Sequence, residues 1–330
     1  MNKYIINARP PNDSIKKALN NKEEDYFCTR TLEWSINPII EDGIFDEIII
    51  SYDGKLCKEI IDKLSEKSKT PIITVPTSRH FTRTVDDLLF GNDPENLDGV
   101  DLKSFVNNND KIFVAHMDAF YDQNIYQTMI NFDRPLVFGT HNYTIFQVGR
   151  NYYKWIADNM ILGSVEFLRD KNVRFSWNTF TETKKENFYK LAKMKDIWIS
   201  GVHLSQIKNL DGLHEGSLTL AILQYLEQIN PTDLVDIGDS NSITKDGGHL
   251  KAFFNPNPQS GQRFIVNNAI IQAVIFGKVD EQAHSINQIE PQARLSVKLK
   301  LSDYERSYFG QKILNNQEKD NLNLLIEDLL

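Results

Sequence analysis

Two aspartates that follow hydrophobic runs are the residues of this sequence best suited to chemistry. Asp118 stands in IFVAHMDAFYD, just after the apolar residues 112–115, and Asp236 stands in LVDIGD, where an apolar run meets a glycine. A carboxylate at the carboxyl edge of a parallel sheet is held by rigid backbone and still reaches solvent. Mg²⁺ prefers one or two carboxylates and bridges to substrate phosphates, so the pair predicts a magnesium site. The alternative is that each aspartate only caps a strand or begins a turn.

The hydrophobic pattern predicts the elements that position these aspartates. The opening YIIN predicts a buried strand, and the polar stretch ARPPNDSIKKALNNKEED after it predicts a loop. The predicted helices that follow are 31–42, with Pro38 inside it and Gly43 as its C-cap, and 56–64. The predicted strands are 45–51, 70–75, 112–115, the segment PLVFGTHNY, 196–201 and 233–237. This alternation predicts an α/β fold, a three-layer sandwich with a mainly parallel central sheet.

The later part of the chain predicts a second, smaller region. The strongest helical pattern is 217–228, with Ser217 as its N-cap. The composition changes most clearly at FNPNPQSGQ, residues 254–262. We therefore expect a main domain over 1–254 and a small C-terminal extension over 255–330. That extension ends in an acidic amphipathic helix, 320–330, which we expect to dock within the chain.

Composition and charge exclude several classes of protein. The 330 residues include 45 acidic and 37 basic ones, a net charge of −8, which is the wrong sign for a general binder of nucleic acid or anionic membrane. The two cysteines, Cys28 and Cys57, form no CxxC motif and predict small apolar fillers. No signal peptide and no apolar run of about 18 residues stand in the sequence. We expect a cytoplasmic protein with neither nucleic acid nor membrane as partner.

The sequence lacks the motifs of several enzyme classes. No P-loop, dinucleotide fingerprint or GxSxG elbow occurs, which disfavours P-loop ATPases, NAD enzymes and serine hydrolases. No HxxxH or HExxH spacing predicts a zinc site. His116 lies two residues before Asp118 and so on the same face of an extended strand. It is either a partner of the metal site or a core histidine.

Four segments, in the same order and at plausible spacing, resemble the sugar-phosphate nucleotidyltransferases and related cytidylyltransferases. They are TLEWSINPIIEDGIFDEIIISYDGKLCKEIIDKL, NDKIFVAHMDAFYDQNIYQTMINF, DIWISGVHLSQI and EGSLTLAILQYLEQINPTDLVDIGDSNSITKDGGHLKAF. The resemblance covers most of residues 3–254. It implies the nucleotide-diphospho-sugar transferase fold and an enzyme that joins a nucleoside triphosphate to a sugar phosphate or similar small phosphorylated metabolite. Pyrophosphate is released, and the activated sugar would serve polysaccharide biosynthesis.

The resemblance also implies roles for individual residues. Asp118 and Asp236 would bind Mg²⁺ as the cofactor, and Arg9 and Lys16 would act on the triphosphate in catalysis. The nucleotide would be bound by Ala8, Arg9, Lys17, His80 and Arg83. The phosphorylated substrate would be bound by Gly139, Ser200, Gly201 and Glu215. Self-association into a homo-oligomer is left open.

The sequence departs from the family in two places. The family's first loop is rich in glycine, whereas ARPPNDSIKKALNN has none, so basic side chains would have to neutralise the phosphates there. Leu234 stands where the family has tryptophan. Two alternatives follow: a glycosyltransferase that uses a nucleotide-sugar, and a catalytically inactive nucleotide-binding module of the same fold. His80 and Arg83 also fit a surface turn.

Overall fold

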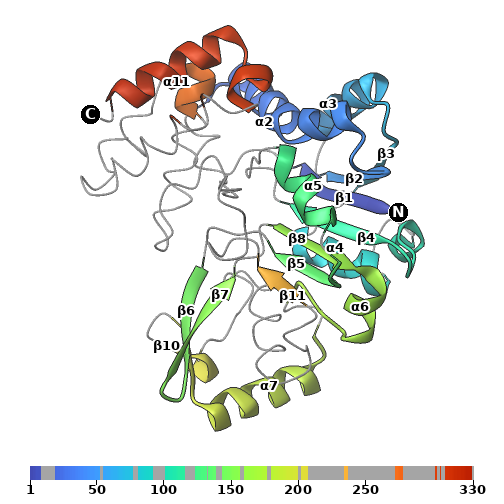
Figure 1. Cartoon of the computed structure of the whole chain (residues 1–330), viewed down its shortest axis with the longest axis vertical. Coiled ribbons are helices and arrows are strands. Elements are labelled where there is room, and N and C mark those ends of the chain that lie inside the picture. Colours follow the sequence, from blue (N-terminus) through green and yellow to red (C-terminus); the bar gives the residue numbers. More distant parts are fainter. Residues whose placement is uncertain are drawn as a thin grey trace. The chain divides into compact units, whose positions relative to one another are not determined.

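The computed structural model of the chain (Figure 1) describes helices and strands from both ends of the sequence. The described residues are 1–8, 19–52, 55–76, 81–91, 101–115, 123–131, 133–138, 143–156, 160–176, 180–199, 202–206, 234–236, 272–277, 302, 305 and 309–328. The chain divides into two compact units. The first unit comprises 1–5, 79–114 and 132–243, and the second comprises 6–78, 115–131 and 244–330. The domain boundary that we expect after residue 254 stays a prediction.

The first unit contains five strands of the larger sheet. In order across the sheet they are β11 (Leu234–Asp236), β5 (Leu136–Phe138), β8 (Met160–Ser164), β4 (Lys111–Ala115) and the first residues of β1 (Asn2–Ala8). β11 and β5 are parallel, whereas β5 and β8 are antiparallel. A hydrogen bond of 2.9 Å from the Lys111 amide to the Met1 carbonyl joins the start of β4 to the start of β1.

The second unit contains the last residues of β1, followed across the sheet by β2 (Glu47–Tyr52) and β3 (Ile72–Pro76). β2 and β3 are parallel, with Ile48 opposite Ile72. The described helices of this unit include α2 (Asn21–Asp42), α3 (Lys55–Lys67), α5 (Gln123–Asn131) and α11 (Asn316–Asp328), with a π-helical turn at Phe309–Ile313 before α11. The α/β class with a mainly parallel central sheet is therefore confirmed.

The first unit also holds a second sheet, which the sequence pattern did not predict. Its strands, in the order β10-β9-β6-β7, are Val202–His203, Ile197–Ile199, Tyr143–Val148 and Asn151–Ile156, and all their pairings are antiparallel. Gly149, at φ +58°, turns the chain between β6 and β7. The other elements of the unit are α4 (Phe81–Phe90), α6 (Val165–Asp170), α7 (Glu182–Lys195) and 3₁₀ turns at Leu102–Phe105 and Leu204–Gln206. The predicted helix 217–228 lies outside the described residues.

Helix α2 begins ten residues before its predicted start, so the prediction of a loop through residue 25 was wrong. Asn20 accounts for the difference. Its side chain accepts hydrogen bonds from the amides of Lys22 and Glu23, both at 3.1 Å, and the Glu23 carboxylate accepts one from the Asn20 amide at 2.9 Å. This capping box satisfies donors that a helix start otherwise leaves unpaired. Gly43 ends the helix at φ +59°, as predicted.

The buried carboxylate of Asp86, on α4, organises the segment after α6. It accepts hydrogen bonds from the amides of Phe175 and Ser176, at 2.7 and 2.9 Å. The guanidinium of Arg174 lies 3.6 Å from the centre of the Phe90 ring. Burial lowers the pKa of Arg174 and outweighs the opposite effect of the charges on Asp86 and Asp87. One acidic side chain thus fixes two backbone amides against a helix nearly 90 residues away.

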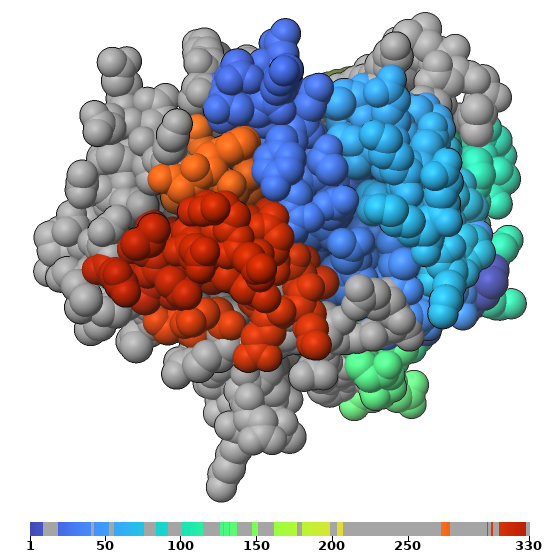
Figure 2. All heavy atoms as spheres, turned by 90° about the horizontal axis from the view of Figure 1, so that it is seen from above, coloured from blue at the N-terminus to red at the C-terminus, as the bar shows by residue number. Residues whose placement is uncertain are grey.

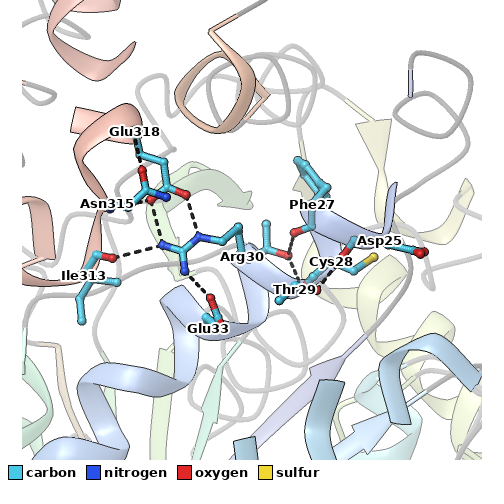
Figure 3. Close-up of polar contacts among 10 residues, drawn as sticks. Asp25, Phe27, Cys28, Thr29, Arg30, Glu33, Ile313, Asn315 and Glu318 are labelled. Carbon is cyan, nitrogen blue, oxygen red and sulfur yellow. Dashed lines mark hydrogen bonds and ion pairs between the residues drawn. The ribbon is translucent and has the colours of Figure 1, made fainter. Parts of the chain in front are cut away.

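Helix α11 docks on α2 through an ion-pair cluster that we call the Arg30 clasp: Arg30, Glu33 and Glu318 (Figure 3). Arg30 donates from Nε and Nη2 to the two oxygens of Glu318, at 2.7 and 2.9 Å, and from Nη1 to Glu33. Nη2 also reaches the carbonyl of Ile313, at 3.3 Å. Burial alone would lower the pKa of Arg30, yet Glu318 and Glu33 together raise it above its usual value. Docking of the C-terminal helix within the chain is confirmed.

A second contact holds α11 in the same unit. Asn321 donates from Nδ2 to the carbonyl of Val274 at 2.9 Å, and the ring of Phe276 lies 6.1 Å from that of Tyr26 on α2. Leu322 and Leu325 are buried on α11. Figure 2 shows α11 in red and residues 272–277 in orange against α2 in blue. These two leucines therefore face the protein, whereas Leu324 on the same helix is 59% exposed.

Apolar side chains fill the core of each unit. The rings of Tyr4 and Phe113 stack at 5.4 Å in the first unit, and those of Phe45 and Tyr126 meet edge to face at 5.8 Å in the second. Cys28 and Cys57 are both buried, in agreement with the prediction of small apolar fillers. Among the described residues, no helix combines the length and apolar character needed to span a membrane.

The Arg30 clasp and the start of α11 depend on Glu318 in two separable ways. Glu318 accepts from the Asn315 amide, and its own amide donates to Asn315 Oδ1, both at 2.9 Å. Glutamine keeps this cap but removes the charge, so we expect Glu318→Gln to lower the free energy of unfolding by about 1–3 kcal/mol. Glu318→Ala removes both and should cost about 3–5 kcal/mol. Urea unfolding measures the free energy of unfolding of both variants. The control is Glu327→Gln, because Glu327 is exposed on the same helix. If Glu318→Gln and Glu327→Gln unfold at the same urea concentration, the Arg30 clasp does not stabilise the protein.

Asp86 gives a second stability prediction. Asparagine has the same size as aspartate, but its NH₂ group would replace one of the two oxygens that accept from the amides of Phe175 and Ser176. One of these two amides would then face another donor. We expect Asp86→Asn to lower the free energy of unfolding by about 1–3 kcal/mol, measured by urea unfolding. The control is Asp133→Asn, because Asp133 is exposed. If the two variants unfold at the same urea concentration, the Asp86 hydrogen bonds do not anchor residues 175 and 176.

Candidate functional site

In the first unit, the candidate site begins with Asp236 at the carboxyl end of a parallel strand pair. Asp236 is the last residue of β11 and lies opposite Phe138, the last residue of β5. Gly139 follows Phe138 directly in the sequence. Because both strands run in one direction, their carboxyl ends lie at the same edge of the sheet. This is the edge at which open α/β sheets bind ligands.

In the second unit, a buried polar pair lies near the carboxyl ends of β1 and β2. Ser51 donates from Oγ to Oδ1 of Asn7 at 3.1 Å. Asn7 is 5% exposed and Ser51 is fully buried, and Ala8, the last residue of β1, is also buried. Sequence reasoning missed this pair. The signal available was one polar residue ending each of two apolar runs, YIIN and EIIIS.

The hairpin of β9 and β10 carries a polar cluster next to two predicted substrate residues. Trp198 donates from Nε1 to Asp196 at 2.6 Å, and His203 Nδ1 is 2.7 Å from the Ser205 hydroxyl. The rings of Trp198 and His203 meet edge to face at 5.1 Å. Asp196 itself ends α7 in the left-handed conformation, at φ +54°. These contacts hold the two strands that flank Ser200 and Gly201 in the sequence.

Three of the predicted site residues stand on described elements. Ala8 ends β1, Arg83 lies in α4 and Asp236 ends β11. The others lie outside the described residues: Arg9, Lys16, Lys17, His80, Asp118, Gly139, Ser200, Gly201 and Glu215. His116 lies outside them as well. The functional roles of all these residues stay predictions.

Asp236 ends β11, and carboxylate oxygens are ligands that Mg²⁺ prefers; its role as a metal ligand stays a prediction. Within the described ranges, no group of three or more His, Cys, Asp or Glu side chains gathers to hold a metal ion. The second carboxylate of the predicted site, Asp118, follows the last described residue of β4 by three positions.

No protein-family model matches this chain, and no curated protein matches it. Among solved structures, it is similar to 4-diphosphocytidyl-2C-methyl-D-erythritol synthase from Anaerococcus prevotii at 13% identity, over 75% of this chain and 94% of that one, with a TM-score of 0.37. It is also similar to a putative glucose-1-phosphate thymidylyltransferase from Bacillus anthracis at 11% identity, over 62% and 92%, with a TM-score of 0.35.

A third similar structure is HddC from Yersinia pseudotuberculosis, at 13% identity over 52% of this chain and 80% of that one, with a TM-score of 0.33. Likenesses at these scores carry no argument about what this chain binds or does. The fold class rests on the strand order and pairing described above.

Proposed function

We propose that this protein is a Mg²⁺-dependent nucleotidyltransferase that activates a sugar phosphate, or a similar small phosphorylated metabolite, with a nucleoside triphosphate. The observation that carries the proposal is the position of Asp236 at the carboxyl end of β11, beside the parallel strand β5. The sequence resemblance to nucleotidyltransferases, in which this aspartate would be a metal ligand, supports the same reaction.

In the proposed reaction, a phosphate oxygen of the acceptor attacks the α-phosphorus of the triphosphate, and the bond to pyrophosphate breaks. Asp118 and Asp236 would hold Mg²⁺, which when bound offsets the negative charge that develops on the reacting phosphates. Arg9 and Lys16 would balance charge on the triphosphate, with Lys17 beside them. Positioning and charge stabilisation supply the catalysis, because phosphoryl transfer asks little covalent chemistry of the protein.

The remaining residues of the proposed site bind rather than react. Ala8, His80 and Arg83 would contact the nucleotide. The acceptor would be contacted by Gly139, Ser200, Gly201 and Glu215. The antiparallel pairing of β9 with β10, which flank Ser200 and Gly201 in the sequence, supports a frame for this acceptor side.

Release of pyrophosphate tests the reaction. We expect the full chain, with MgCl₂, one of the four common nucleoside triphosphates and a panel of sugar 1-phosphates, to release pyrophosphate. Asp118→Asn should lower kcat by about 100-fold or more, because it removes charge stabilisation at the reacting phosphates. Its melting temperature should stay within a few degrees of the wild type, as for the control Asp133→Asn. Full activity in Asp118→Asn would remove the proposed metal role, and consumption of a nucleotide-sugar without triphosphate turnover would indicate a glycosyltransferase.

Thermal unfolding tests the Mg²⁺ dependence separately from turnover. A ligand that binds only the folded state, present at 100 times its Kd, adds about 2.7 kcal/mol to the free energy of unfolding. We expect a nucleoside triphosphate to raise the melting temperature more with MgCl₂ than with EDTA, and Asp236→Asn to abolish that difference. Calorimetry of the wild type and both aspartate variants measures it. A rise that is independent of Mg²⁺ would favour the inactive nucleotide-binding module.

A further inference from the structure

Three side chains in the segment that follows α7 lie in a row within the first unit: Asp196, His203 and Ser205. His203 Nδ1 is 2.7 Å from the hydroxyl oxygen of Ser205. On the other side of the ring, His203 Nε2 is 3.6 Å from Oδ1 of Asp196. A histidine between a hydroxyl and a carboxylate is the arrangement by which enzymes activate a serine as a nucleophile.

The backbone fixes which ring nitrogen of His203 can take a proton. The amide of Ser205 donates to Nδ1 at 3.2 Å, so Nδ1 presents its lone pair to Ser205. In the neutral ring the proton is then on Nε2, on the side of Asp196. The Ser205 hydroxyl therefore donates to Nδ1. The nitrogen that faces the hydroxyl is the one that can accept its proton.

Asp196 and Trp198 hold the histidine in this orientation. Trp198 donates from Nε1 to Oδ1 of Asp196 at 2.6 Å, and its ring meets that of His203 edge to face at 5.1 Å. A carboxylate on the Nε2 side stabilises the positive charge that the ring acquires when it takes a proton. The His203 side chain is 13% exposed, whereas Ser205 is exposed. The base is thus sheltered, and the hydroxyl is open to a substrate.

We propose that Ser205 is a nucleophile that takes an acyl group from an activated ester, with His203 as its general base and Asp196 as the positioning residue that orients the imidazole. Oγ of Ser205 attacks the carbonyl carbon of the ester and forms a bond to it, and the bond from that carbon to the leaving oxygen breaks. The hydroxyl proton passes to Nδ1 and then to the leaving oxygen. Water later releases the acyl group as a carboxylic acid. The inference goes beyond the proposed function, because this reaction needs neither a nucleotide nor Mg²⁺.

The surroundings of Ser205 indicate how fast such a reaction would be. A nucleophile, a base and an acid in this order recur on unrelated folds, so the arrangement does not need a GxSxG elbow. Here they come from the C-cap of α7, from β10 and from a 3₁₀ turn. Since Ser205 is exposed, water solvates the oxyanion that forms, and general-base catalysis, about 10²–10⁴-fold, supplies the acceleration. We therefore expect slow turnover of esters with good leaving groups.

Hydrolysis of 4-nitrophenyl acetate by the full chain tests the proposal. We expect release of 4-nitrophenolate above the rate in buffer, and mass spectrometry of peptides should find an acetyl group on Ser205. Ser205→Ala should remove that acetylated peptide and lower the release to the rate in buffer. His203→Phe keeps an aromatic ring against Trp198 and should lower kcat about 100-fold. The control is Ser104→Ala, which removes an exposed hydroxyl that donates to the Asp101 carbonyl.

Asp196→Asn tests the positioning role. Asparagine keeps an oxygen for the indole of Trp198 and tolerates the left-handed conformation of residue 196, at φ +54°. Because the Asp196 side chain is 57% exposed, its charge acts weakly, and we expect kcat to fall about fivefold while KM stays unchanged. A variant with the kcat of the wild type overturns the role of Asp196.

Other outcomes decide the role of Ser205 itself. The proposal is overturned if the wild type hydrolyses the ester no faster than buffer, if acetyl groups appear on lysines but not on Ser205, or if Ser205→Ala is as active as Ser104→Ala. NMR of the wild type gives a test without variants, because it reports the protonation of each ring nitrogen of His203. We expect a proton on Nε2 and none on Nδ1 in the neutral ring, and the opposite result would overturn His203 as the base.

Discussion

Parallel pairing of strands is the constraint on which this structure depends. A parallel pair cannot be closed by a tight turn, so each strand must be followed by a crossover segment before its neighbour begins. The pairs β2 with β3 and β11 with β5 obey this rule. As a result, Phe138 and Asp236, the last residues of β5 and β11, lie side by side at the carboxyl end of that pair in the first unit.

The sequence predicts those parts of the fold that local patterns encode. Four features were anticipated closely: the apolar runs that became β2 and β4, the amphipathic period of α3, and the αL glycine that ends α2. The start of α2 was missed although Asn20 and Glu23 stand at the spacing of a capping box. The many polar residues around these two positions favour a loop and so mask the capping signal.

Other parts depend on partners far away in the chain, and no local pattern reports them. The apolar run 196–201 predicted strand β9, but not its pairing with β6, about 50 residues earlier. In the sequence, Asp86 is one of two adjacent acidic residues in a helix, and nothing local indicates a partner. The fold brings the amides of Phe175 and Ser176 to its carboxylate. The hydrogen bond between Asn7 and Ser51 needs β1 and β2 to be neighbours in the right register. For the candidate site, the sequence therefore proposes residue types, and the fold decides which of them meet.

The Arg30 clasp has a consequence for a chain being made on the ribosome. Arg30 and Glu318 are 288 residues apart, so at a synthesis rate of about 5–20 residues per second roughly 15–60 s separate the appearance of the two. Throughout that interval Arg30 can pair with Glu33, one helical turn away on α2. Glu33 lies on the same helix and can pair with Arg30 locally, whereas the bond to Glu318 has to wait until nearly the whole chain has been synthesised.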